Sequence, residues 1–254
     1  SAASDVYKRQ EQTKASDLPQ ALQTQMIFQD PFSSLNPRKR VIDIITEAPI
    51  FHGLIARKQK NEFAAEMLQR VGLDPDTLQR YPHQFSGGQR QRIGIARALA
   101  VSPELLVCDE SIAALDVSIQ AQIINLFVRL RDEFTLTYLF ISHDIGVIEH
   151  ISDRVIVMYL GRIVETAPIS SFLQTPNHPY TKALLAGVPR LEVGKREYEP
   201  VSGEIPSPLD PPTGCHFHPR CPFASERCQR EAPLLRELSA GHFSACHLND
   251  EAQP

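Results

Sequence analysis

Apolar residues along the chain alternate between short unbroken runs and longer stretches with helical spacing. Residues 26–28 and 105–108 are unbroken apolar runs of strand length, and residues 136–141 are apolar except for Thr137. The last two segments are typical of strands buried on both faces. Between those two, residues 119–130 place apolar side chains three and four positions apart, which predicts an amphipathic helix. Strand, helix and strand make one βαβ crossover, so both strands are expected to end at the same edge of a sheet.

Three further segments carry a pattern. Residues 38–84 show helical spacing, which predicts a small helical insert. A helix is expected over about residues 89–101, because a Ser-Gly-Gly turn precedes it and Pro103 stops it. Residues 154–159 and 162–166, joined through a glycine, predict a hairpin.

Length and composition bound the class of protein. The 254 residues are 42% apolar and 22% charged, enough to bury the core of one or two soluble domains, and no apolar run reaches the roughly 18 residues of a membrane helix. A net charge of −4 and a pI near 6.1 give no broad basic field, so nucleic acid is not an expected partner. Five cysteines without a signal peptide favour a reducing compartment, the cytosol.

The first ten residues, SAASDVYKRQ, are polar and do not lead into the pattern that follows. They look like the adapter-derived tail that occurs at the ends of metagenomic gene fragments. Residues 1–24 are therefore predicted to be a non-native lead and a remnant of a preceding lobe. An ordinary frayed terminus is the alternative.

Acidic and imidazole side chains follow the two buried strands. Asp109 and Glu110 come directly after the first strand, and phosphoryl transfer needs one carboxylate for Mg²⁺ and another to orient water. Surface carboxylates at strand ends are the alternative. His143 follows the second strand, where an imidazole can hydrogen-bond a γ-phosphate or the attacking water; a core histidine is the alternative.

Two loops carry candidate nucleotide contacts. Residues 86–89 read Ser-Gly-Gly-Gln, and two glycines at a helix N-terminus let a phosphate approach the backbone; a simple helix cap is the alternative. Gln29 lies between a strand and the helical insert, where a glutamine can contact nucleotide or be merely solvated. Pro31 and Pro37 are expected to exclude a regular element just after it.

Taken in order, these residues resemble the motifs of the ABC ATPase family. Gln29 resembles the Q-loop, then Ser86, Gly87, Gly88 and Gln89 the signature, residues 105–109 the Walker B strand, Glu110 the catalytic carboxylate, Leu115 and Asp116 the D-loop, and His143 the switch histidine. The resemblance implies an α/β fold: a P-loop NTPase-like ABC ATPase core over residues 25–168, with a helical subdomain at about 38–84 and a small Cys-rich extension over 169–254.

The resemblance also implies roles for these side chains. ATP and Mg²⁺ would be the cofactors, with Asp109 holding Mg²⁺, Glu110 polarising water and His143 steadying the γ-phosphate. In a head-to-tail dimer the signature of one subunit would clamp the ATP of the other. Gln29 and the helical insert would form the coupling surface toward membrane partners, and Gln89 and Asp116 would complete the nucleotide contacts.

Three stretches place the chain in one branch of that family. Residues 28–31, 34–37 and 177–181, which read FQDP, SLNP and NHPYT, look like the oligopeptide and dipeptide (peptide or nickel) importers. The branch implies a second ATPase subunit in a homo- or heterodimer, two integral membrane permease subunits and a periplasmic or extracellular substrate-binding protein. The chain would then be peripheral, at the cytoplasmic face of the plasma membrane.

The sequence departs from the family at several positions. Ser111 stands where proline is usual and Ala113 where serine is common, but neither change removes a carboxylate. No G-x-x-x-x-G-K-[ST] occurs, so the lysine and backbone groups that hold the β- and γ-phosphates are absent from these residues. We therefore expect the chain to be N-terminally truncated and unable to hydrolyse ATP by itself.

Four cysteines lie after a Pro-rich segment at residues 205–213. They are Cys215, Cys221, Cys228 and Cys246, with five, six and seventeen residues between them. So many cysteines with little hydrophobic periodicity suggest that a metal supplies part of the core. Resemblance to the importer ATPases favours a [4Fe-4S] cluster; Zn²⁺ is the second choice and free thiols the alternative. Cys108, within a predicted strand, is expected to be a core residue.

Two other classes of function remain open from the sequence. A soluble ABC ATPase of DNA repair or translation would share the nucleotide motifs, although two cassettes or a long coiled insert are usual there and neither occurs. A redox or metal sensor built around the four cysteines is the second rival. The transported peptide or metal is not encoded in these motifs.

Overall fold

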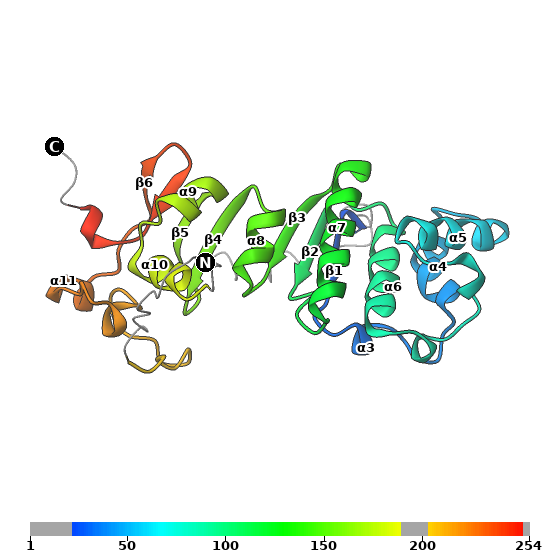
Figure 1. The fold of residues 1–254 in the computed structure, drawn as a ribbon, viewed down its shortest axis with the longest axis horizontal. Helices are drawn as coiled ribbons and strands as arrows, with labels where there is room; N and C mark the ends of the chain where they lie inside the picture. The colour runs from blue at the N-terminus through cyan, green and yellow to red at the C-terminus, as the bar shows by residue number, and fades with distance from the viewer. Residues whose placement is uncertain (1–21, 189–202, 251–254) are drawn as a thin grey trace. The chain divides into compact units, whose positions relative to one another are not determined.

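The computed structural model describes residues 22–188 and 203–250, in two compact units that divide between His143 and Asp144 (Figure 1). The predicted lead at residues 1–24 falls almost entirely outside the described residues. The domain boundaries expected at residues 24 and 168 remain predictions.

The first unit is built on a parallel sheet of β1 (Thr24–Ile27), β2 (Leu105–Asp109) and β3 (Thr137–Ile141), with β2 in the centre. Helix α7 (Val117–Phe134) makes the crossover from β2 to β3, which confirms the predicted βαβ unit. Phe127 of α7 is fully buried, and its ring meets Tyr138 and Phe140 of β3 edge-on at 5.6 and 5.8 Å between centroids. Burial of these aromatic rings holds the helix on the sheet.

The helical insert also forms as predicted. It consists of α4 (Val41–Phe51) and α5 (Lys60–Arg70) with the short turns η2 (Arg57–Gln59), η3 (Pro75–Thr77) and η4 (Pro82–Gln84), and it leads into α6 (Gly87–Leu99). Two arginines tie its end to the following helices, because Arg92 donates to the carbonyl of Val71 at 2.7 Å and Arg129 to that of Arg70 at 2.6 Å. These guanidinium groups satisfy carbonyls that the end of α5 leaves without helical partners.

One local prediction was wrong. The prolines were expected to exclude regular structure after Gln29, but α3 (Pro31–Ser34) forms a single helical turn there. Proline is tolerated at the first position of a helix, because the N–H that it lacks would have no partner in the helix anyway.

Helix α7 packs closely against α6 at Gly88. A methyl group built there would lie 2.6 Å from Cγ2 of Ile119, well inside contact distance. Six residues further along α6, Gly94 has no such neighbour within 4 Å. The two glycines of one helix therefore differ: packing requires the first and only tolerates the second.

The second unit contains an antiparallel sheet in the order β4-β5-β7-β6. Its elements are α8 (Ile145–Ile151), β4 (Arg154–Tyr159), β5 (Arg162–Pro168), α9 (Ile169–Gln174), α10 (Pro179–Ala186), η5 (His218–Arg220), α11 (Glu226–Arg230), β6 (Arg236–Ser239), β7 (His242–Ser244) and η6 (His247–Asn249). Strands β4 and β5 confirm the predicted hairpin. The Cys-rich segment adds β6 and β7 to the same sheet, which the sequence did not predict.

A buried carboxylate organises this unit. Glu165 on β5 has no exposed surface and accepts three hydrogen bonds of 2.8 Å, from the backbone N–H groups of Asn177 and His178 and from Nε2 of His242. Strand β5, the start of α10 and strand β7 thus meet on one side chain. A buried charge is tolerated only where its oxygens are satisfied in this way.

The Asn-His-Pro-Tyr-Thr stretch at residues 177–181 is the segment that Glu165 holds. Asn177 and Asn249 exchange two side-chain amide hydrogen bonds of 3.1 and 2.9 Å. His178 caps α10, because its Nδ1 accepts the backbone N–H of Tyr180 at 3.1 Å. Tyr180 and the buried Phe217 pack with ring centroids 5.4 Å apart. This motif therefore has a structural role in attaching the Cys-rich segment.

Acid should destabilise the second unit through His178. Burial, opposed by the charge of Glu165, lowers the pKa of His178 to about 4. The unfolded chain takes up this proton below about pH 6.5, so the contribution to stability is complete above that pH and is lost, by about 3 kcal/mol, between about pH 6.5 and 4. Urea unfolding across this range should show the loss, and His178→Asn, which can still cap α10, should remove it. An equal pH slope in both proteins would contradict this assignment.

The two glycines of α6 provide a matched pair of substitutions. We expect Gly88→Ala to lower the free energy of unfolding by about 1–3 kcal/mol, because β-branched Ile119 cannot move its Cγ2 aside cheaply. Gly94→Ala should raise it by about 0.5–1 kcal/mol, since alanine has the higher helix propensity and open space is available. Urea midpoints measure both changes; a similar shift in both variants would refute the packing difference.

Candidate functional site

The ends of the three parallel strands bring the predicted catalytic side chains together. In the sheet register Ile27, Cys108 and Phe140 lie side by side. The ladder continues beyond β2, because the backbone N–H of Glu110 donates to the carbonyl of Ile141 at 3.0 Å. Loop residues that follow equivalent strand positions are therefore neighbours at one edge of the sheet, as the βαβ pattern predicted.

Glu110 is the centre of this group. Its Oε2 accepts a hydrogen bond of 2.7 Å from Nε2 of Gln29, and its Oε1 lies 3.2 Å from Nδ1 of His143. An ionised carboxylate only accepts, so in this arrangement Nδ1 of His143 carries the hydrogen. The three residues come from three different strand ends, which is what a site assembled by the fold requires.

The backbone at Glu110 is unusual. Its φ of 43° lies in the left-handed region, which a side chain other than glycine seldom adopts. This conformation turns the chain sharply after Asp109, the last residue of β2. Strain of this kind persists only where the surrounding structure enforces it, and it is concentrated at functional sites.

Asp109 and Asp116 lie at the end of β2 and just before the start of α7. Asp109 pairs with Ile141 across the sheet, directly beside Glu110. Asp116 precedes α7 at its N-cap position but makes no side-chain capping bond to that helix. Its carboxylate is therefore not committed to the helix start.

The Ser-Gly-Gly-Gln segment forms a reciprocal cap at the start of α6. Ser86 Oγ accepts the N–H of Gln89 at 3.3 Å, and Gln89 Oε1 accepts the N–H of Ser86 at 3.0 Å. The capping alternative is therefore confirmed for these two side chains. The N–H groups of Gly87 and Gly88 have no acceptor within the helix, because they lie in its first turn.

The signature segment is not part of the Glu110 group. Among residues 22–188 and 203–250, no hydrogen bond or ion pair joins residues 86–89 to Gln29, Glu110 or His143. The structure thus assembles two separate parts of the predicted nucleotide chemistry within the first unit.

Arg97, which the sequence did not single out, links α3 to α6. Its guanidinium, near the end of α6, donates to the backbone carbonyl of Ser34 in α3. Burial of this side chain lowers the pKa of Arg97. The contact links the signature helix to the segment that follows Gln29. One of several arginines in this helix, Arg97 carried no sequence signal that set it apart.

The four predicted cysteine ligands lie in one region of the second unit. Burial, together with charge on Cys221, Cys215 and Cys228, raises the pKa of Cys246 to about 11. The backbone N–H of Cys215 donates to the carbonyl of Cys228 at 2.8 Å, so these two cysteines lie in adjacent stretches of chain. Even so, within the described ranges no three His, Cys, Asp or Glu side chains stand in an arrangement that could hold a metal ion.

The histidines near these cysteines are engaged elsewhere. Nδ1 of His216 lies 3.1 Å from the carbonyl of Leu160, Nδ1 of His218 lies 3.0 Å from that of Cys215, His242 contacts Glu165, and His247 contacts Asp250. Cys108 is fully buried in β2, and burial raises the pKa of this thiol to about 12. It is a core residue, as expected.

Comparisons with known proteins point to one family of transport ATPases. The ABC transporter family model matches residues 5–113, and the model of the oligopeptide/dipeptide transporter C-terminal region matches residues 164–228. The oligopeptide transport ATP-binding protein AppF of Bacillus subtilis (strain 168) is 55% identical over 88% of this chain and 69% of its own length. The Sinorhizobium fredii protein y4tS, named for a peptide ABC transporter, is 51% identical over 90% of this chain and 65% of its own.

A solved structure shows the same fold class. The dimeric, post-hydrolysis structure of the ATP-binding cassette MJ0796 bound to ADP and Pi superposes with a TM-score of 0.54 at 26% identity, over 62% of this chain and 68% of the other. The α/β ABC ATPase fold is thereby confirmed. The chain aligns with 69% of the length of AppF at 55% identity, which is enough to assign the family. This chain therefore belongs to the ATP-binding proteins of oligopeptide and dipeptide ABC transporters.

Proposed function

We propose that the chain is the ATP-hydrolysing subunit of an ABC importer for peptides. The observation that carries this proposal is the contact of Glu110 with both Gln29 and His143 at the carboxyl edge of the parallel sheet. The relatives named for peptide and oligopeptide transport support the choice of cargo. Peptide is favoured over nickel on those names, and no feature of the described residues favours a soluble ABC ATPase.

Glu110 is proposed as the group that activates water. Its carboxylate would accept a proton from the attacking water, while Nδ1–H of His143 keeps it in place and Gln29 senses whether the site is filled. Asp109, the neighbouring carboxylate at the strand end, would hold Mg²⁺. When bound, this ion neutralises charge on the phosphates.

The signature segment is proposed to act on a second subunit. Ser86, Gly87 and Gly88 begin α6 away from Glu110, and the N–H groups of its first turn suit an anion supplied from outside the unit. Asp116, which is not used as a cap, would meet the same interface. A head-to-tail dimer would satisfy both, and the MJ0796 cassette is itself dimeric.

The further partners follow from the proposed role. Two integral membrane permease subunits and an external substrate-binding protein would complete the importer, with this subunit peripheral at the cytoplasmic membrane face. No helix in the described part of the chain is both long and apolar enough to cross a membrane. Gln29, α3 and the helical insert would carry the coupling to the permeases.

The four cysteines are proposed to bind a metal, preferably as a [4Fe-4S] cluster and otherwise as Zn²⁺. The donor types suit either, since thiolates hold both iron–sulfur clusters and structural Zn²⁺. Burial raises the pKa of Cys215, Cys221 and Cys246, so binding at these thiols must displace protons. The present side-chain positions do not form a ligand set, so the thiols would have to turn toward one another.

Hydrolysis tests the main proposal. The 254-residue polypeptide contains no G-x-x-x-x-G-K-[ST], so we expect no Mg-ATPase activity from it alone. In a hybrid that joins residues 22–254 to the P-loop segment of a related ABC ATPase, we expect activity, and Glu110→Gln should lower kcat by about 10²–10⁴-fold. Glu133→Gln, at an exposed position late in α7, is the matched control. Activity that survives Glu110→Gln would sink the assigned role.

Metal content tests the cysteine proposal. Anaerobically purified protein should carry about four iron atoms per chain with absorbance in the visible range, or about one Zn²⁺ without colour. Cys221→Ser should abolish either signal by removing one of four ligands. Cys108→Ala is the control, because this thiol is buried in β2. If elemental analysis finds neither iron nor zinc in amounts comparable to the protein, the proposal is rejected in favour of free thiols.

A further inference from the structure

Three of the four cysteines are fixed to one another through the backbone. The N–H of Cys215 donates to the carbonyl of Cys228 at 2.8 Å. Next to it, Gly214 approaches the same carbonyl so closely that a methyl group would lie 2.4 Å from the oxygen. The N–H of Cys221 donates to the carbonyl of His218 at 3.3 Å, which closes the turn η5 after Cys215.

Cys246 reaches this group from another part of the fold. It follows β7, and the N–H of Ala245 donates to the carbonyl of Val164 on β5 at 2.8 Å. The sheet thus fixes the chain just before Cys246. The chain just after Cys246, by contrast, contacts the segment of Cys228 through the side chains of His247 and Asp250.

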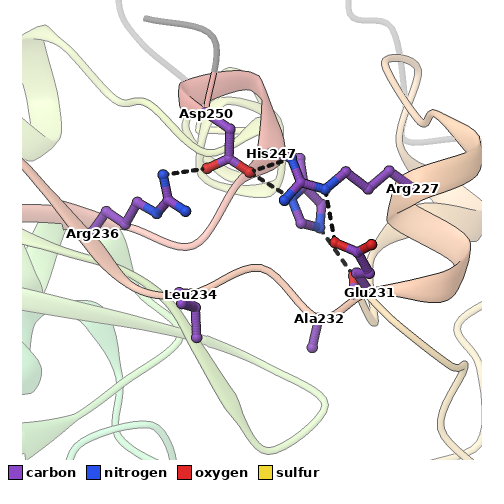
Figure 2. Close-up of a pocket in the computed structure, with 7 residues that line it drawn as sticks. All are labelled: Arg227, Glu231, Ala232, Leu234, Arg236, His247 and Asp250. Carbon is purple, nitrogen blue, oxygen red and sulfur yellow. Dashed lines mark hydrogen bonds and ion pairs between the residues drawn. The ribbon is translucent and has the colours of Figure 1, made fainter. Parts of the chain in front are cut away.

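Those contacts converge on Asp250 (Figure 2). Its Oδ2 lies 2.8 Å from Nη1 of Arg227 and 2.9 Å from Nδ1 of His247, and its Oδ1 lies 2.9 Å from Nη1 of Arg236. Helix α11, strand β6 and turn η6 are therefore joined by one carboxylate. Its side chain is only 13% exposed, so the ion pairs are less screened than pairs on an open surface.

Glu231 closes the ring on the other side. Its carboxylate lies 2.8 Å from Nε of Arg227, and its backbone carbonyl lies 3.0 Å from Nε2 of His247. In Figure 2 the side chains of Arg227 and His247 lie beside each other between Asp250 and Glu231. These groups border a cavity of about 350 Å³ with Leu234 and Ala232 on its far side. The charged groups around the cavity are paired with one another, so it does not present itself as a ligand site.

Two residues of this charged cluster are direct sequence neighbours of two of the four cysteines. Arg227 directly precedes Cys228, and His247 directly follows Cys246. Seventeen residues separate Cys228 from Cys246 in the sequence. The contacts of Arg227 with Asp250 and of His247 with Glu231 therefore join the two segments that carry these cysteines. A network of several charges sharing one carboxylate holds such segments better than a single exposed pair does.

We propose that Asp250 is the positioning residue of the four-cysteine site: through Arg227, Arg236 and His247 it holds the segment of Cys246 against that of Cys228. The inference concerns the same cysteines as the metal proposed above, but its contacts lie between protein groups. It can therefore succeed or fail independently of any metal.

Site-by-site thiol alkylation tests the proposal. The reduced, metal-free chain is treated with a maleimide, and the labelling rate of each cysteine is followed by peptide mass spectrometry. Asp250→Asn should raise the rate at Cys246 at least tenfold, because this segment loses its attachment, and should leave Cys215 and Cys221 within twofold. Asp250→Glu should restore slow labelling. Arg236→Gln, which removes a different partner of the same carboxylate, should act in the same direction as Asp250→Asn.

A matched control lies on the same helix. Glu226 pairs with Arg230 at 3.2 Å on the exposed side of α11 and has no contact with Asp250, so Glu226→Gln should change no rate. Buried Cys108 reports global unfolding. The proposal is overturned if Cys246 in Asp250→Asn stays within twofold of the parent rate. It is equally overturned if Cys215 and Cys221 accelerate together with Cys246, because the substitution would then act on the whole second unit.

Discussion

The register of three parallel strands is the constraint on which the candidate catalytic site depends. Because β1, β2 and β3 run in the same direction and align Ile27, Cys108 and Phe140, the residues that follow them leave the sheet at one edge. Gln29 and His143 can then reach the same carboxylate from opposite neighbouring strands. A slip of β3 by one residue would turn its side chains to the other face and take His143 out of reach.

In the second unit, the buried carboxylate of Glu165 has the corresponding role. It ties β5, the start of α10 and His242 of β7 into one hydrogen-bonded group. The Asn-His-Pro-Tyr-Thr stretch, which pointed to the importer branch in the sequence, is thereby explained physically: its backbone N–H groups satisfy a charge that would be costly to bury alone. A branch-specific motif can mark how an extension is attached rather than what is transported.

The sequence predicted the parts of the structure that depend on local pattern. Apolar runs and helical spacing located β2, α7, β3 and the β4-β5 hairpin, and the strand ends located Glu110 and His143. Strands β6 and β7 were not predicted because they are short and all four residues of β6 are exposed. Their place in the sheet depends on β7 pairing with the distant strand β5, where Glu165 lies opposite Ser244 and Thr166 opposite Phe243. The roles of Arg97 and Asp250 were not predicted for the same reason, because both residues act through contacts with residues distant in the sequence.

The signature segment shows why a structural and a functional explanation can both hold. Ser86 and Gln89 cap α6, and Ile119 demands a glycine at position 88, so each of these residue types has a reason within the fold. Capping by side chains nevertheless leaves the N–H groups of Gly87 and Gly88 directed out of the first turn. Because the Glu110 group does not use them, they are the groups to which we assign the proposed contact with an anion of a second subunit. The packing and capping that fix the helix start are therefore compatible with that proposed contact.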